Sequence, residues 1–160
     1  MQVATALTES GLRLTEPVRS LLDRKGHAVW SVSPQDTVFS AIETMSERRV
    51  GALVVLMDGQ PVGIVSERDY ARKVVLMGRN SHSTAVREIM TSPVLYVTPE
   101  QSIEACMRLM TSRRIRHVPV VEGQKVVGVL SIGDIVNWML SAQQQAIHDL
   151  HNYIAGSYPA

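Results

Sequence analysis

The sequence predicts an α+β protein (an α/β-type sandwich) made of two copies of one motif, each a small sheet with packed helices. The first observation is an internal repeat: residues 32–70 and 97–135, at an offset of 65 and without gaps, are identical at 10 of 39 positions. Chance gives roughly two or three identities at ordinary residue frequencies. The second observation is that helices and strands follow in the same order in both copies. A repeat of this length is too long for a solenoid unit, so we expect two copies related by pseudo-twofold symmetry.

Composition narrows the class of protein. With 160 residues, of which 45% are hydrophobic and 19% charged, the chain fits one globular domain whose two copies share a core. The net charge of +1 does not favour a nucleic-acid or membrane partner. A single cysteine, Cys106, excludes a disulfide framework and a cysteine-based zinc site. The chain shows neither an apolar run of about 18 residues nor a signal peptide, so we expect a cytoplasmic protein.

The first copy is predicted at residues 17–80, after a flexible polar leader at 1–16. A short helix begins at Pro17 and ends at Gly26, and a short strand follows at 29–32. The next helix has apolar residues at helical spacing between 38 and 45. Strands at 53–57 and 61–65 are joined by Asp58-Gly59, which is a hairpin signal. The last helix begins at Ser66 and is expected to continue to about Gly78.

The second copy is predicted at residues 86–141, after a linker at 81–85. The stretch 78–84, which overlaps this linker, has no apolar side chain. The second copy repeats the order: an entry helix at 86–90, a strand at 94–97, a helix from Ile103, and hairpin strands at 118–121 and 126–130. The last helix begins at Ser131. Its helical tail, predicted at 142–160, keeps apolar residues at helical spacing, so it is expected to need a partner surface.

A short motif ends the last strand of each copy: Ser66-x-x-Asp69 and Ser131-x-x-Asp134. One interpretation is helix capping, in which the Ser hydroxyl and the carboxylate satisfy early backbone N–H groups. The other is ligand binding, because a helix N-terminus favours phosphate and a carboxylate accepts hydrogen bonds from ribose hydroxyls. Both use the same geometry, and the duplication favours the second. Arg68 lies in the first helical turn, where a cation opposes the dipole unless an anion is nearby.

Basic residues gather before the second hairpin: Arg113, Arg114, Arg116 and His117. The first two have counterparts in Arg48-Arg49, so we assign them mainly to a helix end. Arg116 and His117 have none, because the first copy carries Gly51-Ala52 there. This asymmetry indicates that one copy supplies charge for phosphate and the other supplies room.

The sequence shows no enzyme constellation. Cys106 falls on an apolar helix stripe and is expected in the core. The histidines lack the spacing of metal ligands, and no Walker or Rossmann glycine motif is present. We therefore expect no catalytic residues and no metal site.

Each copy thus has an entry segment Val-Arg-x-apolar-(Leu/Met), a hairpin, and a glycine strand ending in Ser-x-x-Asp. This order resembles a pair of cystathionine-β-synthase (CBS) domains over residues 17 to about 140. The chain is similar in more detail to small stand-alone bacterial CBS-pair proteins, through Ser-Glu-Arg-Asp-Tyr-Ala-Arg-Lys at 66–73 and Arg-His-Val-Pro-Val at 116–120. It departs from the family at Val54, where proline is usual.

The resemblance implies a regulatory module that binds adenosine nucleotides in clefts between the copies and forms a homodimer. Ser66 with Asp69, and Ser131 with Asp134, are implied to contact phosphate and ribose, while Ile64 and Val129 lie beside adenine. The opposite copy is implied to contribute Ile115, Arg116 and His117 to the Ser66 site, and Val50, Gly51 and Ala52 to the Ser131 site. His117 alternatively turns towards the site in its own copy.

Three functional classes stay open at this point. The first is a sensor of AMP, ATP, NAD(H), S-adenosylmethionine or a similar nucleotide that signals to a separate regulated protein. The second is a ligand-free interaction scaffold in which capping is the whole role of the Ser-x-x-Asp motifs. The third, a nucleic-acid binder acting through the patch at Arg113–Arg116, is weakened by the balanced charge and the 4% aromatic content.

Overall fold

The computed structural model describes residues 14–156 and divides into two compact units. Among these residues, unit 1 contains 14–26, 98–118 and 130–156, and unit 2 contains 27–97 and 119–129. The division does not follow the repeat, because the first entry helix is grouped with the helices of the second copy. The predicted domain boundaries, which follow the repeat, stay a prediction. Most of the predicted leader, 1–13, lies outside the described residues.

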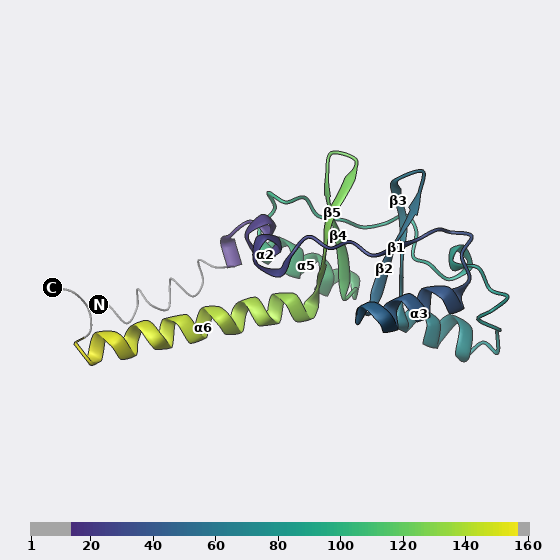
Figure 1. Cartoon of the computed structure of the whole chain (residues 1–160). Coiled ribbons are helices and arrows are strands. Elements are labelled where there is room, and N and C mark those ends of the chain that lie inside the picture. The colour runs from purple at the N-terminus through teal and green to yellow at the C-terminus, as the bar shows by residue number, and fades with distance from the viewer. Residues whose placement is uncertain (1–13, 157–160) are drawn as a thin grey trace. The chain divides into compact units, whose positions relative to one another are not determined.

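Unit 2 is built on a three-stranded sheet of β1 (Ser31–Val32), β2 (Ala52–Met57) and β3 (Gln60–Ser66), in the order β1-β2-β3 (Figure 1). β1 pairs with β2 in parallel, and β2 with β3 antiparallel. Asp58 and Gly59 both have positive φ, 52° and 75°, as the tight hairpin turn requires. The first predicted hairpin is therefore confirmed, and β1 is shorter than the predicted strand.

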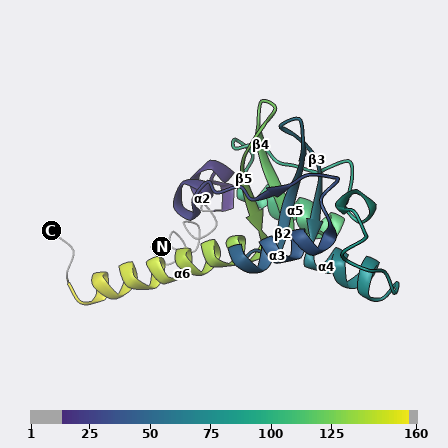
Figure 2. The same ribbon diagram turned by 45° about the vertical axis from the view of Figure 1, so that its right-hand side comes forward.

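Helix α3 (Val38–Arg48) lies against β2 and supplies one side of the unit 2 core (Figure 2). Its buried face, predicted from helical spacing, contains Val38, Ala41 and Met45. These side chains pack with apolar residues of the sheet and of the segments that follow it: Val32, Leu53, Val55, Val65, Val74, Val86 and Ile89. The core thus uses the apolar runs that the sequence predicts as strands.

The segments after the sheet are more broken than predicted. The predicted helix from Ser66 to Gly78 is α4 (Glu67–Tyr70) followed by a π-helical turn, η1 (Ala71–Val75). The predicted entry helix at 86–90 is only a 3₁₀ turn, η2 (Val86–Glu88). It ends early because Thr91 exchanges two backbone hydrogen bonds with Ile64, of 2.9 and 3.1 Å, which require extended backbone. The prediction of a strand at 94–97 is wrong: in this described segment only Val97 forms a bridge, to Val120.

The predicted linker, 81–85, is held by hydrogen bonds within unit 2. The Thr84 carbonyl accepts the Val38 N–H at 2.9 Å, and the Ser81 carbonyl accepts the Phe39 N–H at 3.0 Å. Both donors lie in the first turn of α3, whose N–H groups have no partner inside the helix. Thr84 is itself buried and donates to the Asn80 carbonyl at 2.7 Å. These residues therefore complete the start of α3.

Unit 1 consists mainly of α2 (Val18–Lys25), α5 (Ile103–Arg113) and α6 (Ile132–Ile154). Two backbone bonds hold α2 beside the start of α5, from Val18 N to Gln101 O at 2.8 Å and from Ile103 N to Glu16 O at 2.9 Å. The buried faces of the three helices form the core of this unit: Val18, Leu21, Leu22, Ile103, Cys106, Met110, Ile135, Trp138 and Ala142.

The second hairpin consists of β4 (His117–Glu122) and β5 (Lys125–Ser131), with Gly123 at φ 64° in the turn. The hairpin prediction is therefore confirmed. The unit boundary falls inside both strands. β5 leads directly into α6 at Ser131, so the end of this strand positions the second Ser-x-x-Asp motif.

Candidate functional site

Both Ser-x-x-Asp motifs form helix-capping boxes. In the first, the Ser66 N–H donates to Asp69 Oδ2 at 2.9 Å and the Asp69 N–H donates to Ser66 Oγ at 3.2 Å. In the second, the Ser131 N–H donates to Asp134 Oδ2 at 2.7 Å and the Asp134 N–H donates to Ser131 Oγ at 3.1 Å. The capping interpretation is thus confirmed, and it fixes both carboxylates at the first turn of a helix.

A second contact, also repeated, brings predicted residues to each motif. The Glu67 N–H donates to the Gly51 carbonyl at 3.0 Å, and the Ile132 N–H donates to the Arg116 carbonyl at 2.8 Å. The chain entering each hairpin therefore lies beside the Ser-x-x-Asp motif of its own copy. Because capping and this contact satisfy two early N–H groups of each helix, less of the helix N-terminus is left for phosphate than the sequence alone suggests.

The Asp69 carboxylate has a lysine beside it from its own helical segment. Lys73 Nζ lies 2.9 Å from Asp69 Oδ1 and also donates to the Ile89 carbonyl at 2.8 Å. The Asp69 side chain is only 14% exposed, which strengthens this ion pair relative to one in open water. The carboxylate, its cation and the Ser66 hydroxyl form one compact polar cluster in unit 2.

The Asp134 carboxylate takes its cation from a distant part of the sequence. Lys25, the last residue of α2, places Nζ 2.5 Å from Asp134 Oδ2, within unit 1. The Asp134 side chain is 20% exposed. Lys25 is not among the site residues predicted from the sequence, because 109 positions separate it from Asp134 and no local spacing links them.

His117 adds an imidazole to the Asp134 cluster. Burial lowers the pKa of His117 below its ordinary value, while the nearby Asp134 carboxylate acts in the opposite direction and Lys25 and Arg116 add to the lowering. All four residues belong to unit 1. Which copy's site His117 serves stays a prediction.

The remaining predicted residues have the following positions. Ala52 is the β-partner of Ser66, and Ile64 is the β-partner of Val54, in the sheet of unit 2. Val50, Ile115 and Val129 are half-buried, and Arg68 is exposed. The expected contributions of each copy to the site of the other stay a prediction.

Arg114 ends α5 with φ 54°, as Arg49 ends α3 with φ 55°, which supports the helix-end interpretation of these arginines.

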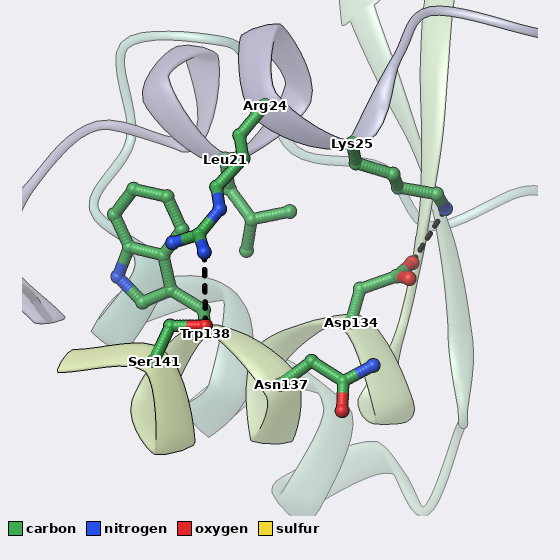
Figure 3. A pocket seen from close by; sticks show the side chains of 7 residues that line it. All are labelled: Leu21, Arg24, Lys25, Asp134, Asn137, Trp138 and Ser141. Carbon is green, nitrogen blue, oxygen red and sulfur yellow. Dashed lines mark hydrogen bonds and ion pairs between the residues drawn. The ribbon is translucent and has the colours of Figure 1, made fainter. Parts of the chain in front are cut away.

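A pocket of about 250 Å³ lies beside Asp134 in unit 1, between α2 and α6 (Figure 3). Lys25 and Asp134 meet at one end of it, and Arg24 reaches from α2 towards α6 farther along. The Arg24 guanidinium donates to Ser141 Oγ at 3.0 Å and lies 5.8 Å from the centre of the Trp138 ring. Among these residues, only Asp134 is a site residue predicted from the sequence.

The environment of Cys106 does not favour thiol chemistry near neutral pH. Cys106 is buried, and burial raises the pKa of its thiol to about 12, so the reactive thiolate is scarce near neutral pH. Between residues 14 and 156, no three or more His, Cys, Asp or Glu side chains gather as metal ligands do. None of the helices in this range has both the length and the apolar character of a membrane span.

Known proteins share both the motif and the fold. The family model for the CBS domain matches residues 18–76 and 86–141. The chain belongs to the CBS-domain family. It is 38% identical, over 95% of its length and 78% of the relative's, to the mitochondrial CBS domain-containing protein CBSX3 of Arabidopsis thaliana.

Solved CBS structures agree with this assignment. A CBS-domain protein from Burkholderia ambifaria MC40-6, named for a role in signal transduction, is 46% identical with a TM-score of 0.75. The match covers 78% of this chain and 94% of that one, so little of that chain lies outside the CBS pair. A hexameric CBS-CP12 protein from bloom-forming cyanobacteria is 31% identical with a TM-score of 0.68, and the match covers 75% of this chain and 69% of that one. Oligomeric CBS-domain relatives therefore exist.

Proposed function

We propose that this CBS-domain protein is a regulatory module that binds adenosine nucleotides at its two Ser-x-x-Asp motifs and relays their occupancy to a separate protein. The observation that carries the proposal is a polar cluster that recurs at both motifs, in which a helix-capping serine, a fixed carboxylate and a lysine lie together. Adenosine ligands are typical of CBS domains.

The chemistry of each cluster suits a ribose phosphate. A fixed carboxylate accepts hydrogen bonds from the two ribose hydroxyls, as in other nucleotide sites. Lys25 and Lys73 offset the negative charge of these carboxylates, which would otherwise repel a phosphate. Each lysine also supplies an ammonium group that pairs with the phosphate. A ligand that binds one conformation better than another shifts the population towards it, and a partner protein reads that shift.

The test is thermal melting against AMP, ATP, NAD⁺, NADH and S-adenosylmethionine, with Asp69→Asn and Asp134→Asn alongside. Saturation at about 100 times Kd adds roughly 2.7 kcal/mol to the free energy of unfolding, which is several degrees in melting temperature. We expect at least one nucleotide to raise the melting temperature and one or both variants to lose that shift. A flat panel, obtained with protein shown to be free of bound nucleotide, would reject the proposal.

The rival function is a ligand-free interaction scaffold. It is favoured by the capping bonds, which already satisfy the Ser and Asp side chains without a ligand. The same melting panel separates the two, since a scaffold shows no nucleotide-dependent shift in the wild-type protein.

We also propose self-association through the second half of α6. Ile147, Leu150 and Ile154 are 68%, 50% and 75% exposed and are spaced along one face of this helix. A second copy presenting the same face would cover them, as the homodimer expectation requires.

A further inference from the structure

The pocket between α2 and α6 has the size and charge for part of a nucleotide. Its volume of about 250 Å³ is below the roughly 300–1,000 Å³ of complete small-molecule sites. Asp134, the carboxylate to which the proposed function assigns the ribose, forms one end of it. The pocket therefore has room for part of a nucleotide only, and the charge of its wall decides which part it suits.

The pocket wall carries more positive than negative charge. Arg24 and Lys25 provide two cations, and Asp134 provides one carboxylate. Lys25 lies next to Asp134, whereas Arg24 lies two helical turns along α6, beside Ser141. Lys25 is thus close to the ribose position and Arg24 is farther from it. Successive phosphates of a nucleotide would lie in the same order.

Trp138 gives Arg24 a defined place. Trp138 is 8% exposed, and its ring lies under the guanidinium, with 5.8 Å between the guanidinium carbon and the ring centre. A cation–π contact favours a guanidinium over the ring, and the guanidinium has five N–H donors, so donors beyond the one used on Ser141 suit a phosphate. Asn137 and Ser141, on the same side of α6, add an amide and a hydroxyl that donate hydrogen bonds to phosphate oxygens.

The first copy lacks these side chains at the corresponding positions. At the repeat offset of 65, Trp138 corresponds to Lys73 and Ser141 to Leu76, and the entry segments align Arg24-Lys25 with Ser92-Pro93. Lys73 is bonded to both Asp69 and the Ile89 carbonyl, so this cation stays next to the Asp69 carboxylate. The two sites are therefore chemically different.

We propose that the α2–α6 pocket is a polyphosphate subsite, through which the second site prefers nucleoside di- and triphosphates to monophosphates. This inference rests on the proposed nucleotide-binding function. Arg24 contacts the phosphates beyond the first, and Lys25 contacts the phosphate nearest the ribose.

The test is isothermal titration of AMP, ADP and ATP into the full chain carrying Asp69→Asn, which restricts binding to the second site. We expect ATP and ADP to bind at least tenfold more tightly than AMP. Adding Arg24→Gln removes a charge-assisted bond and is expected to weaken ATP binding roughly tenfold or more, with AMP changed by less than about twofold. Arg19→Gln is the matched control, because Arg19 lies on the same helix and bonds Glu100 at 2.6 Å, away from the pocket.

The outcomes separate the subsite from the function. Equal affinities for the three nucleotides, or an Arg24→Gln effect no larger than that of Arg19→Gln, would overturn the subsite while leaving nucleotide binding in place. No binding of any nucleotide, in wild type or variant, would overturn both. If Arg24→Gln lowers the melting temperature of the free protein, Ser141→Ala provides the second test. We expect Ser141→Ala to weaken ATP binding less than Arg24→Gln does, and to leave AMP binding unchanged.

Discussion

Burial decides the chemistry of Cys106. This side chain lies on the inner face of α5 and is inaccessible to solvent, and desolvation of the thiolate raises the pKa to about 12. In an unfolded chain the same thiol has a pKa of roughly 8.5–9. Above about pH 9 the unfolded state releases this proton while the native state keeps it. The native state then binds more protons than the unfolded state, so stability falls as pH rises.

We predict that the stability difference between wild type and Cys106→Ala shrinks at alkaline pH. Each pH unit between about 9 and 12 removes up to about 1.4 kcal/mol from the wild type only, so the change between pH 8 and 10.5 is about 2 kcal/mol. Urea denaturation of both proteins at several pH values measures it. Other alkaline titrations affect both proteins alike and cancel in the difference. Parallel curves for the two proteins over this range would contradict the burial argument.

The lysine partners of the two carboxylates differ in how far they can be predicted from the sequence. Lys73 lies four positions after Asp69 on a helical segment, so their pairing can be expected from spacing. Lys25 pairs with Asp134 only because α2 packs against α6, a tertiary contact that no local pattern encodes. The two Ser-x-x-Asp motifs and Lys73 can be recognised from local sequence. The cation of the second site and the pocket beside it cannot, because both depend on the contact between α2 and α6.

At the scale of elements, one glycine controls how β3 meets the segment after η2. A Cβ added to Gly63 would lie 2.8 Å from Met90 Sδ and 2.9 Å from the Thr91 carbonyl oxygen. Met90 can shift, but the Thr91 carbonyl accepts the Ile64 N–H at 3.1 Å and is held in place. Gly63 therefore permits a close backbone approach that any side chain would push apart.

We predict that Gly63→Ala lowers the free energy of unfolding by about 1–3 kcal/mol, as overpacking does. The matched control is Gly133→Ala in the first turn of α6, where the nearest atom, Ser131 Oγ, would lie 3.5 Å from the new Cβ. There alanine favours the helix, so stability is expected to rise by up to about 1 kcal/mol. Chemical denaturation of the three proteins gives both values, and a Gly63→Ala protein as stable as wild type would show that the contact relaxes at no cost.

The helices and hairpins with clear periodicity, such as α3, α5 and both β-hairpins, were predicted correctly. The errors lie where tertiary hydrogen bonds override the local pattern. Thr91 pairs with Ile64 and ends the second entry helix after one turn. Val97 has a single bridge to Val120 rather than a strand's ladder, although the apolar run at 94–97 resembles β1 of the first copy.

At the scale of the whole molecule, the second half of α6 presents exposed apolar side chains. Figures 1 and 2 show this helix continuing well past α2 and α5 in unit 1. Its exposed apolar side chains at 136, 140, 147, 150 and 154 follow spacings of three and four residues, with Gln143 at the intervening position. This is the pattern of a coiled-coil seam, which becomes stable when a second helix presents the same face.

We predict that wild type self-associates at concentrations of tens of micromolar. The double variant Ile147→Gln, Leu150→Gln is expected to have a lower molar mass in solution, because fewer copies of it associate. Replacing two apolar side chains at the centre of the seam removes most of the apolar surface that association would bury, at about 25 cal/mol per Å². Light scattering after size-exclusion chromatography measures the mass. Gln145→Ala with Asn152→Ala, on the opposite face of α6, is the matched control and is expected to keep the wild-type mass. A monomeric wild type, or an unchanged mass in the seam variant, would show that this face of α6 does not join copies of the chain.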